Sequence, residues 1–250
     1  MSRLRVRAIG TSLVIVLSLT MVGASPAVAS SNGLAGKSSQ QIVSIALAAG
    51  IAKGSVHTDE SGEFDASSYG TLHKDVTKSE GREVDSGTGA IGHGTVLVIK
   101  GIAYAMGDAD FLYGPLTMTQ AVTYAGKWIA FHKGDQGYND FAYNETLVQH
   151  LVDVLPVAPY SRPKFTTLNG IKVVMIAGHE RKSLTSAGLA TDTAYFSASP
   201  PYLPVESDFD IAPTDPNGPY HTTLTFSRWG EKVPVSPPSN PIPASSIFTS

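Results

Sequence analysis

The feature that most limits the possible folds of this chain is a hairpin signal in its second half. Asn169-Gly170 separates two β-prone runs, "KFTTL" and "IKVVMIAG". Asn-Gly readily takes the left-handed backbone that a two-residue turn between antiparallel strands requires. Lys100-Gly101 lies in the same way between "TVLVI" and "IAYAM". The chain is therefore expected to form an antiparallel sheet.

Further strands and two helices are expected along the chain. Alternating or β-branched runs predict strands at 69–77, 82–86, 95–99, 102–106, 127–132, 193–198 and 221–229. Apolar residues at helical spacing predict helices at 38–54 and 139–155, with a helical turn or two at 117–124. Gly and Pro are abundant and charged residues make up 16% of the chain, below the globular average of about 25%. The expected fold class is α+β: a curved antiparallel sheet with helices on one side.

The last part of the chain is expected to end that sheet. "TLTFSRWGEKVPVSPP" predicts a strand, a tight turn at Trp229-Gly230 and a short second strand that runs into prolines. The stretch before it, "SPPYLPVES", is interpreted as turn-rich, and the Pro- and Ser-rich tail is expected to have little regular structure.

The N-terminus predicts export. Three arginines precede an apolar run at 13–22 that is too short to cross a bilayer with margin. Ala27-Val28-Ala29 follows as a small-x-small cleavage site, which favours a cleaved signal over a membrane anchor. The interpretation is a secretory signal peptide at 1–29, a single domain at 30–236 and a tail at 237–250.

Charge and cysteine content narrow the function. Loss of the three arginines lowers the net charge from −3 to −6. An acidic chain without a basic run is a poor partner for nucleic acid or an anionic membrane surface. The chain has no cysteine, so it can form no disulfide, use no thiolate chemistry and carry no lipid on an N-terminal cysteine. No integral membrane segment is expected after signal cleavage.

No local motif for catalysis or metal binding is found. The seven histidines make no His-x-x-x-His pair, and no Gly-x-Ser-x-Gly elbow is present. Asp108 and Asp110 are too few for an EF-hand loop. A Ser/His/Asp site assembled by folding, with His132 or His179 as the base, stays open as an alternative. The expectation is a chain without catalytic residues, metal or cofactor.

The order of the elements resembles a known superfamily. The matching segments are "QIVSIALAAGIAKGSVHT", "GHGTVLVIKGIAYAMGD", "YAGKWIAF", "TLVQHLVDVLP", "TTLNGIKVVMIAG", "TAYFSASPPYLPVES" and the closing "TLTFSRWGEKVPVSPP". In this order they resemble the LolA-like superfamily, and within it the actinobacterial lipoproteins of the LppX/LprG type.

The resemblance implies a half-barrel sheet with helices packed on its concave face. It also implies a hydrophobic cavity that carries acylated lipids between membranes or cell-wall layers, and it implies no catalytic residues. The lipoproteins of this family are anchored through a lipidated cysteine, which this chain lacks. A protein secreted into the medium or cell wall is therefore expected, without a lipid anchor and with transient contact to a membrane or cell wall.

The predicted function is that of a non-enzymatic carrier or binder of a lipid or other amphiphile. The candidate cavity-lining residues are apolar positions on the elements that would face the cavity: Val96, Val98, Tyr104, Met118, Val122, Leu147, Leu151, Val173 and Met175. Two alternatives stay open. One is a structural or protein-interaction module whose core is filled, and the other is a hydrolase with a Ser/His/Asp site that no local motif shows.

Overall fold

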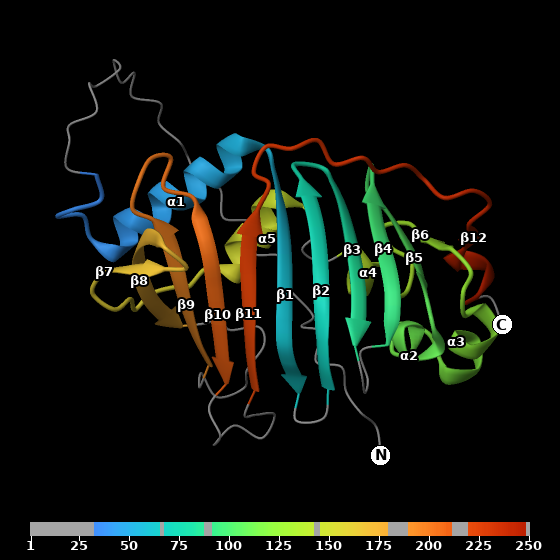
Figure 1. Ribbon diagram of the computed structural model, residues 1–250. Helices are drawn as coiled ribbons and strands as arrows, with labels where there is room; N and C mark the ends of the chain where they lie inside the picture. The colour runs from blue at the N-terminus through green and yellow to red at the C-terminus, as the bar shows by residue number, and fades with distance from the viewer. Residues whose placement is uncertain are drawn as a thin grey trace.

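The computed structural model describes residues 33–65, 68–87, 92–142, 146–179, 190–211 and 220–248. These residues form one twelve-stranded sheet in the order β12-β6-β5-β4-β3-β2-β1-β11-β10-β9-β8-β7. All neighbouring strands in it are antiparallel except β12 and β6. Figure 1 shows a curved sheet with helices against one side. The predicted signal peptide, 1–29, lies outside the described residues.

The strands are β1 (Ser55–Asp65), β2 (Ser68–Thr77), β3 (Glu80–Gly87), β4 (His93–Ile99), β5 (Ile102–Gly107), β6 (Ile129–Phe131), β7 (Lys164–Leu168), β8 (Ile171–His179), β9 (Ala190–Ser197), β10 (Pro204–Ile211), β11 (Tyr220–Ser227) and β12 (Ile242–Pro243). The helices are α1 (Ser39–Lys53), α2 (Ala109–Leu112), α3 (Met118–Tyr124), α4 (Tyr138–Ala142), α5 (Leu147–Val154) and the 3-10 helix η1 (Ala244–Ser246). None of the helices in the described ranges is long and apolar enough to cross a membrane.

Both hairpin predictions are confirmed. Lys100 and Gly101 have φ angles of 53° and 78°, and Asn169 and Gly170 have 48° and 81°, so each pair takes the left-handed backbone of a two-residue turn. The expected start and end of α1 are also confirmed: Ser38 accepts a hydrogen bond from the Gln41 amide in a capping box, and Gly54 ends the helix in the left-handed region.

Three local predictions are wrong. The helix expected at 139–155 is two helices, because Phe141 of α4 and Leu147 of α5 pack into different cores. The turn-rich stretch contains the first half of β10, a strand in which acidic residues alternate with more buried ones. The second strand after Trp229 does not form, since the chain continues without regular structure until β12.

The tail is also more ordered than expected. Ile242 of β12 pairs in parallel with Ile129 of β6, and η1 follows directly. Ala244 and Ile247 are buried among the helices and strands at this end of the sheet. Apolar side chains spaced among the prolines thus dock a segment whose composition predicted little structure.

The sheet is stabilised by two apolar cores on its concave face, which we define as the face that the helices cover. The first core joins α1 and α5 to strands β1, β2, β8, β9 and β11: Leu34, Ile42, Val43, Ala46, Val56, Val76, Leu147, Leu151, Leu155, Val174, Ile176, Ala194, Phe196, Leu224 and Phe226. The second core joins α2–α4 and η1 to β4–β6: Val96, Val98, Ala103, Ala105, Phe111, Leu112, Leu116, Ala121, Ile129, Phe131, Phe141, Ala244 and Ile247.

A pair of glycines makes the second core possible. Gly94 and Gly107 are directly opposite each other in β4 and β5, and the ring of Phe111 lies on both. A Cβ on Gly107 would lie 2.3 Å from Phe111 Cδ1 and 2.7 Å from the carbonyl oxygen of His93. Asp108 holds Phe111 in place, because its carboxylate accepts a hydrogen bond from the Phe111 amide at 2.8 Å.

We expect Gly107→Ala to lower the free energy of unfolding by about 1–3 kcal/mol, as overpacked cores do. The added methyl group meets a backbone oxygen that belongs to the sheet and a ring that is fully buried. Urea unfolding measures the change. Val122→Ala, at an exposed position of α3, is the control and should change the value by less than about 0.5 kcal/mol. An alanine variant as stable as the wild type would contradict the packing described above.

Candidate functional site

The nine predicted cavity-lining residues do not converge. Val96 and Val98 of β4 face the helices within the second core. Leu147 and Leu151 of α5 lie in the first core and are fully buried. These four residues share the concave face, but they belong to two separate apolar clusters.

The other five point elsewhere. Tyr104 packs in a small cluster on the convex face, because its neighbours along β5 already face the helices. Val173 and Met175 lie on the convex side of β8 for the same reason, since the residues that alternate with them belong to the first core. Met118 and Val122 are exposed on α3. Apolar character alone did not tell the two faces of a strand apart.

Ionisable side chains lie on the concave face of the central strands. Val56 of β1 belongs to the first core, and Thr58 and Glu60 follow it at alternate positions of the same strand. Because successive side chains point to opposite faces of a strand, Thr58 and Glu60 also point toward the helices. Lys74 of β2 is directly opposite Thr58, and Glu83 of β3 is directly opposite Lys74. The ammonium of Lys74 and the carboxylate of Glu83 form a buried ion pair. This polar strip was not predicted from the sequence.

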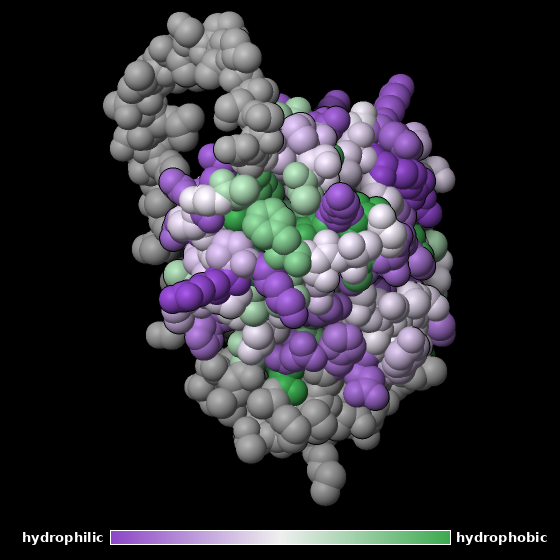
Figure 2. Space-filling model, turned by 60° about the vertical axis from the view of Figure 1, so that its left-hand side comes forward, coloured by the Kyte–Doolittle hydropathy of each residue, from purple (hydrophilic) through white to green (hydrophobic). Residues whose placement is uncertain are grey.

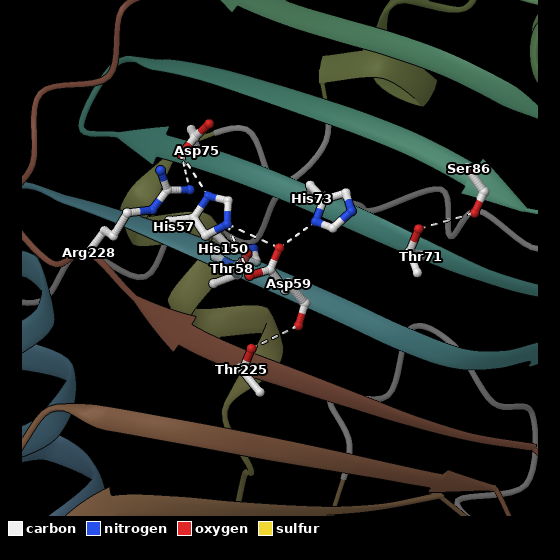
Figure 3. A network of polar contacts seen from close by, with 10 residues as sticks. All are labelled: His57, Thr58, Asp59, Thr71, His73, Asp75, Ser86, His150, Thr225 and Arg228. Atoms are coloured by element: carbon white, nitrogen blue, oxygen red, sulfur yellow. Dashed lines mark hydrogen bonds and ion pairs between the residues drawn. The ribbon is translucent and has the colours of Figure 1, made fainter.

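His150 brings a neutral imidazole from α5 to this strip. Its side chain is buried, and its Nε2 lies 3.2 Å from Oγ1 of Thr58 (Figure 3). Burial, and then the positive charge of Lys74, lower the pKa of His150 to about 3. Its Nδ1 has no hydrogen-bond partner among the described residues. The ring is therefore neutral at physiological pH, with one nitrogen unpaired in the interior.

Asp192 of β9 is a second buried group with unused hydrogen-bonding capacity. Burial, and then the charges of Glu60 and Asp210, raise its pKa to about 7. Burial likewise raises the pKa of Glu60, against a hydrogen bond from Thr222. Oδ2 of Asp192 lacks a hydrogen-bond partner in the described part of the chain. Buried polar atoms normally have partners, so these two atoms are available to a polar group of a ligand or to water.

The convex face carries a different cluster. His57 and Asp59 of β1 lie beside His73 and Asp75 of β2 (Figure 3). Burial raises the pKa of the Asp59 carboxyl, but hydrogen bonds and charges from His73 and His57 outweigh this effect. The pKa of Asp59 therefore lies below its usual value. The sequence holds the signal in two His-x-Asp pairs, whose spacing of two puts both members on one face of a strand. No cluster of histidines with neighbouring acids was predicted, because the two pairs come together only when β1 pairs with β2.

The free edge of the sheet at β7 exposes apolar side chains. Phe165 of β7 and Ile171 of β8 are both about half exposed. Figure 2 brings this end of the molecule forward and shows hydrophobic side chains gathered near the middle of the face, with hydrophilic ones around them. Large apolar side chains are therefore exposed to solvent at this end of the molecule.

Comparison with known proteins finds remote structural neighbours. No protein-family model and no curated protein matches the sequence. LprF from Mycobacterium bovis has a TM-score of 0.48 at 16% identity, over 80% of this chain and 96% of its own. An uncharacterized conserved protein from Thermus thermophilus has a TM-score of 0.43 at 11% identity, over 82% and 96%. A domain from Vibrio parahaemolyticus, proposed to belong to an outer membrane lipoprotein-sorting protein, has a TM-score of 0.32 at 12% identity, over 76% and 91%.

The resemblance of the sequence motifs to the LolA-like superfamily stays a prediction, because these structures share little sequence with this chain and superpose only loosely. The predicted fold class is confirmed by the strand order itself: an open, curved, almost entirely antiparallel sheet with helices on its concave face. At such low identity and TM-score the comparisons give no argument about what this chain binds.

The pKa of Asp192 predicts how stability depends on pH. In the unfolded chain this carboxyl ionises near its ordinary value of 3.8, and in the folded chain near 7. Between these values the folded state binds more protons than the unfolded state, so the free energy of unfolding falls as the pH rises. We expect Asp192→Asn to remove this contribution. The variant should be more stable than the wild type at pH 8, by up to about 4 kcal/mol, and nearly equal to it at pH 4.

Urea unfolding at the two pH values checks this expectation. Glu63→Gln, which alters an exposed carboxyl of β1, is the matched control and should show the same small change at both pH values. An effect of Asp192→Asn that is equal at pH 4 and pH 8 would mean that burial does not hold this carboxyl in its protonated form.

Proposed function

We propose that this protein is a secreted, non-enzymatic carrier or binder of a lipid or other amphiphile. The ligand is held between the concave face of the sheet and helices α1 and α5. Its apolar part contacts α1 and the rim of the first core, and its polar part reaches the strip that contains His150 and Asp192.

The observation that carries the proposal is the composition of α1. Among the fifteen residues of this helix, Lys53 in the last turn is the sole charged one. Ile42 and Ala46 are buried, while Ile45 and Leu47 on other sides of the helix are partly exposed and pack against the first core. A surface helix normally confines its apolar residues to one stripe. Apolar residues around most of α1 support a role in contacting an apolar ligand.

The buried polar strip supports an amphiphile rather than a pure hydrocarbon. Nδ1 of His150 and Oδ2 of Asp192 lack partners among the described residues. Leaving a buried polar atom unpaired costs about 1–3 kcal/mol. Hydroxyl or amide groups at the polar end of a ligand would supply the missing hydrogen bonds and offset that cost.

The filled-core alternative has an observation in its favour. Leu147 and Leu151 are fully buried in direct continuity with the strands of the first core, as in a protein without a ligand cavity. In that case the molecule is a structural or interaction module, and the exposed apolar residues near Phe165 are its contact surface.

The hydrolase alternative has less support. Ser86 Oγ lies 3.2 Å from Nδ1 of His93 on the convex face. Among the described residues, Asp108 contacts the backbone amide of His93 and not its ring. A triad requires a carboxylate on the second ring nitrogen, so this pair is one member short in the part of the chain that the structure describes.

Native mass spectrometry of the protein purified from the culture medium of its own host tests the proposal. We expect an additional discrete mass that organic extraction removes, because apolar burial retains the ligand through purification. Fragmentation of the extract identifies the ligand class. A clean apo mass, with no uptake from a lipid extract of the host, would overturn the carrier proposal and favour the filled-core module.

Substitutions on α1 test where the ligand lies. We expect Ile45→Gln with Leu47→Gln to weaken binding of a fluorescent long-chain fatty acid by at least about tenfold, since burying apolar side chains contributes on the order of 1.5 kcal/mol each. Fluorescence titration gives the dissociation constants, and thermal unfolding shows that the variant is folded. Val122→Gln makes the same kind of change at an exposed position of α3 and should leave binding unchanged. Equal affinity for both variants would exclude α1 from the binding site.

A further inference from the structure

The cluster on the convex face is a two-by-two array across the centre of the sheet. His57 is directly opposite Asp75, and Asp59 is directly opposite His73, in the antiparallel pair β1–β2. The neighbours on both sides, β11 and β3, are fully paired with these strands over the same residues. Figure 3 shows the four side chains pointing toward one another from the two strands. Their backbone positions are therefore held by the most extensively paired part of the fold.

His57 has one carboxylate on each ring nitrogen. Its Nδ1 lies 2.8 Å from Oδ1 of Asp75, and its Nε2 lies 3.0 Å from both carboxylate oxygens of Asp59. A neutral imidazole carries one N–H and can donate only one of these hydrogen bonds. The other nitrogen then presents a lone pair toward a carboxylate, unless the ring is protonated or a cation lies between the two groups.

A metal ion resolves this arrangement. The nearest ligand atoms of His57, Asp59 and His73 all lie within 4.8 Å of one another. Four ligands at the 2.0–2.1 Å bond lengths of zinc stand about 3.3 Å apart in a tetrahedron. The 3.0 Å separation of His57 Nε2 from Asp59 is close to that spacing. His73 and Asp59 are in direct contact, and both side chains are nearly half exposed, so they can turn outward to admit the ion.

We propose that His57, Asp59 and His73 form a zinc-binding site on the convex face of the sheet. Two imidazole nitrogens and one carboxylate oxygen are a donor set that zinc prefers. The three ligands leave a fourth position on the solvent side, which water or a donor from outside the chain can fill. The site goes beyond the proposed function and does not depend on it, because its side chains point away from the helix-covered face.

Asp75 is the positioning residue of this site. Its carboxylate accepts a hydrogen bond from Nδ1 of His57, which leaves Nε2 without a proton and aims it at the ion. Arg228, which follows β11, approaches the same carboxylate oxygen at 3.8 Å. In zinc sites, a ligating histidine usually donates its other ring N–H to a carboxylate or carbonyl oxygen, which fixes the orientation of the ring.

A second His–Asp pair on the same face provides the contrast. Nδ1 of His221 lies 2.8 Å from Oδ1 of Asp210, but its Nε2 lies 3.1 Å from the hydroxyl of Thr223. Thr223 donates its hydroxyl proton to Asp208, so Nε2 of His221 faces a neutral oxygen and not a second carboxylate. In the described part of the chain, no set of three ligand groups is close enough together around His221 to hold a metal ion. The exposure of the His221 side chain is close to that of His73, which makes it a matched control.

The test is isothermal titration of the chelator-treated full protein with zinc chloride. We expect saturable binding of one zinc ion per chain. His73→Ala should weaken it by more than about 100-fold, and Asp75→Asn, which keeps all three ligands, by about 10–100-fold. His221→Ala should bind as the wild type does. Cobalt(II) in place of zinc should give the intense visible bands of a tetrahedral site in the wild type and lose them in His73→Ala.

Two results would overturn the proposal. One is the absence of saturable zinc binding by the wild-type protein at about 100 μM zinc, well above the dissociation constant of a three-ligand zinc site. The other is equal affinity of the wild type, His73→Ala and His221→Ala, which would place the ion elsewhere on the surface. Thermal unfolding of each variant without metal shows whether it is folded. If His73→Ala is not folded, the zinc affinity of Asp75→Asn relative to the wild type tests the proposal instead.

Discussion

The register between β1 and β2 is the constraint on which the rest of this structure depends. Side chains alternate between the two faces of a strand, so a shift of one residue would exchange every inward group for an outward one. In the observed register Val56 and Val76 meet beneath α5 in the first core. The same alternation turns His57 and Asp59 to the convex face. One pairing between two adjacent strands therefore places both the core and the surface cluster.

The interior tolerates its ionisable groups in two ways. Lys74 and Glu83 pair with each other across β2 and β3, which compensates both charges. His150 and Asp192 instead have pKa values shifted toward their neutral forms, because burial disfavours the charged form of each. Buried groups whose charged forms are disfavoured, and whose hydrogen-bonding capacity is unused, are compatible with an apolar interior that receives a polar end group.

The two faces of the sheet are suited to different tasks. The concave face is closed by helices that pack on it as separate groups, α1 and α5 on the first core and α2–α4 on the second. The convex face is open over the central strands, where exposed polar side chains lie in rows set by the strand spacing. A ligand between the helices and the sheet and an ion on the convex face would share the backbone of β1 and β2 without sharing a side chain.

Local chemistry determined what the sequence alone predicted. Asn169-Gly170, Lys100-Gly101 and the capping residues of α1 act within a few residues of themselves, so their turns and helix ends are confirmed. Most strands were recognised from alternation, which is equally local. β10 was missed because its solvent-facing residues are acidic, and a proline begins it.

Only the tertiary structure decided how distant segments meet. β12 docks on β6 more than a hundred residues away in sequence, and His150 of α5 reaches Thr58 of β1. Which face Tyr104 or Val173 occupies depends on what packs against the strand, and an apolar side chain fits a covered position on either side. His57 meets Asp75 because of strand pairing, which a single-sequence pattern does not encode. Short-range sequence patterns thus determine the fold class. The sites depend on contacts between distant segments, which form only when the chain folds.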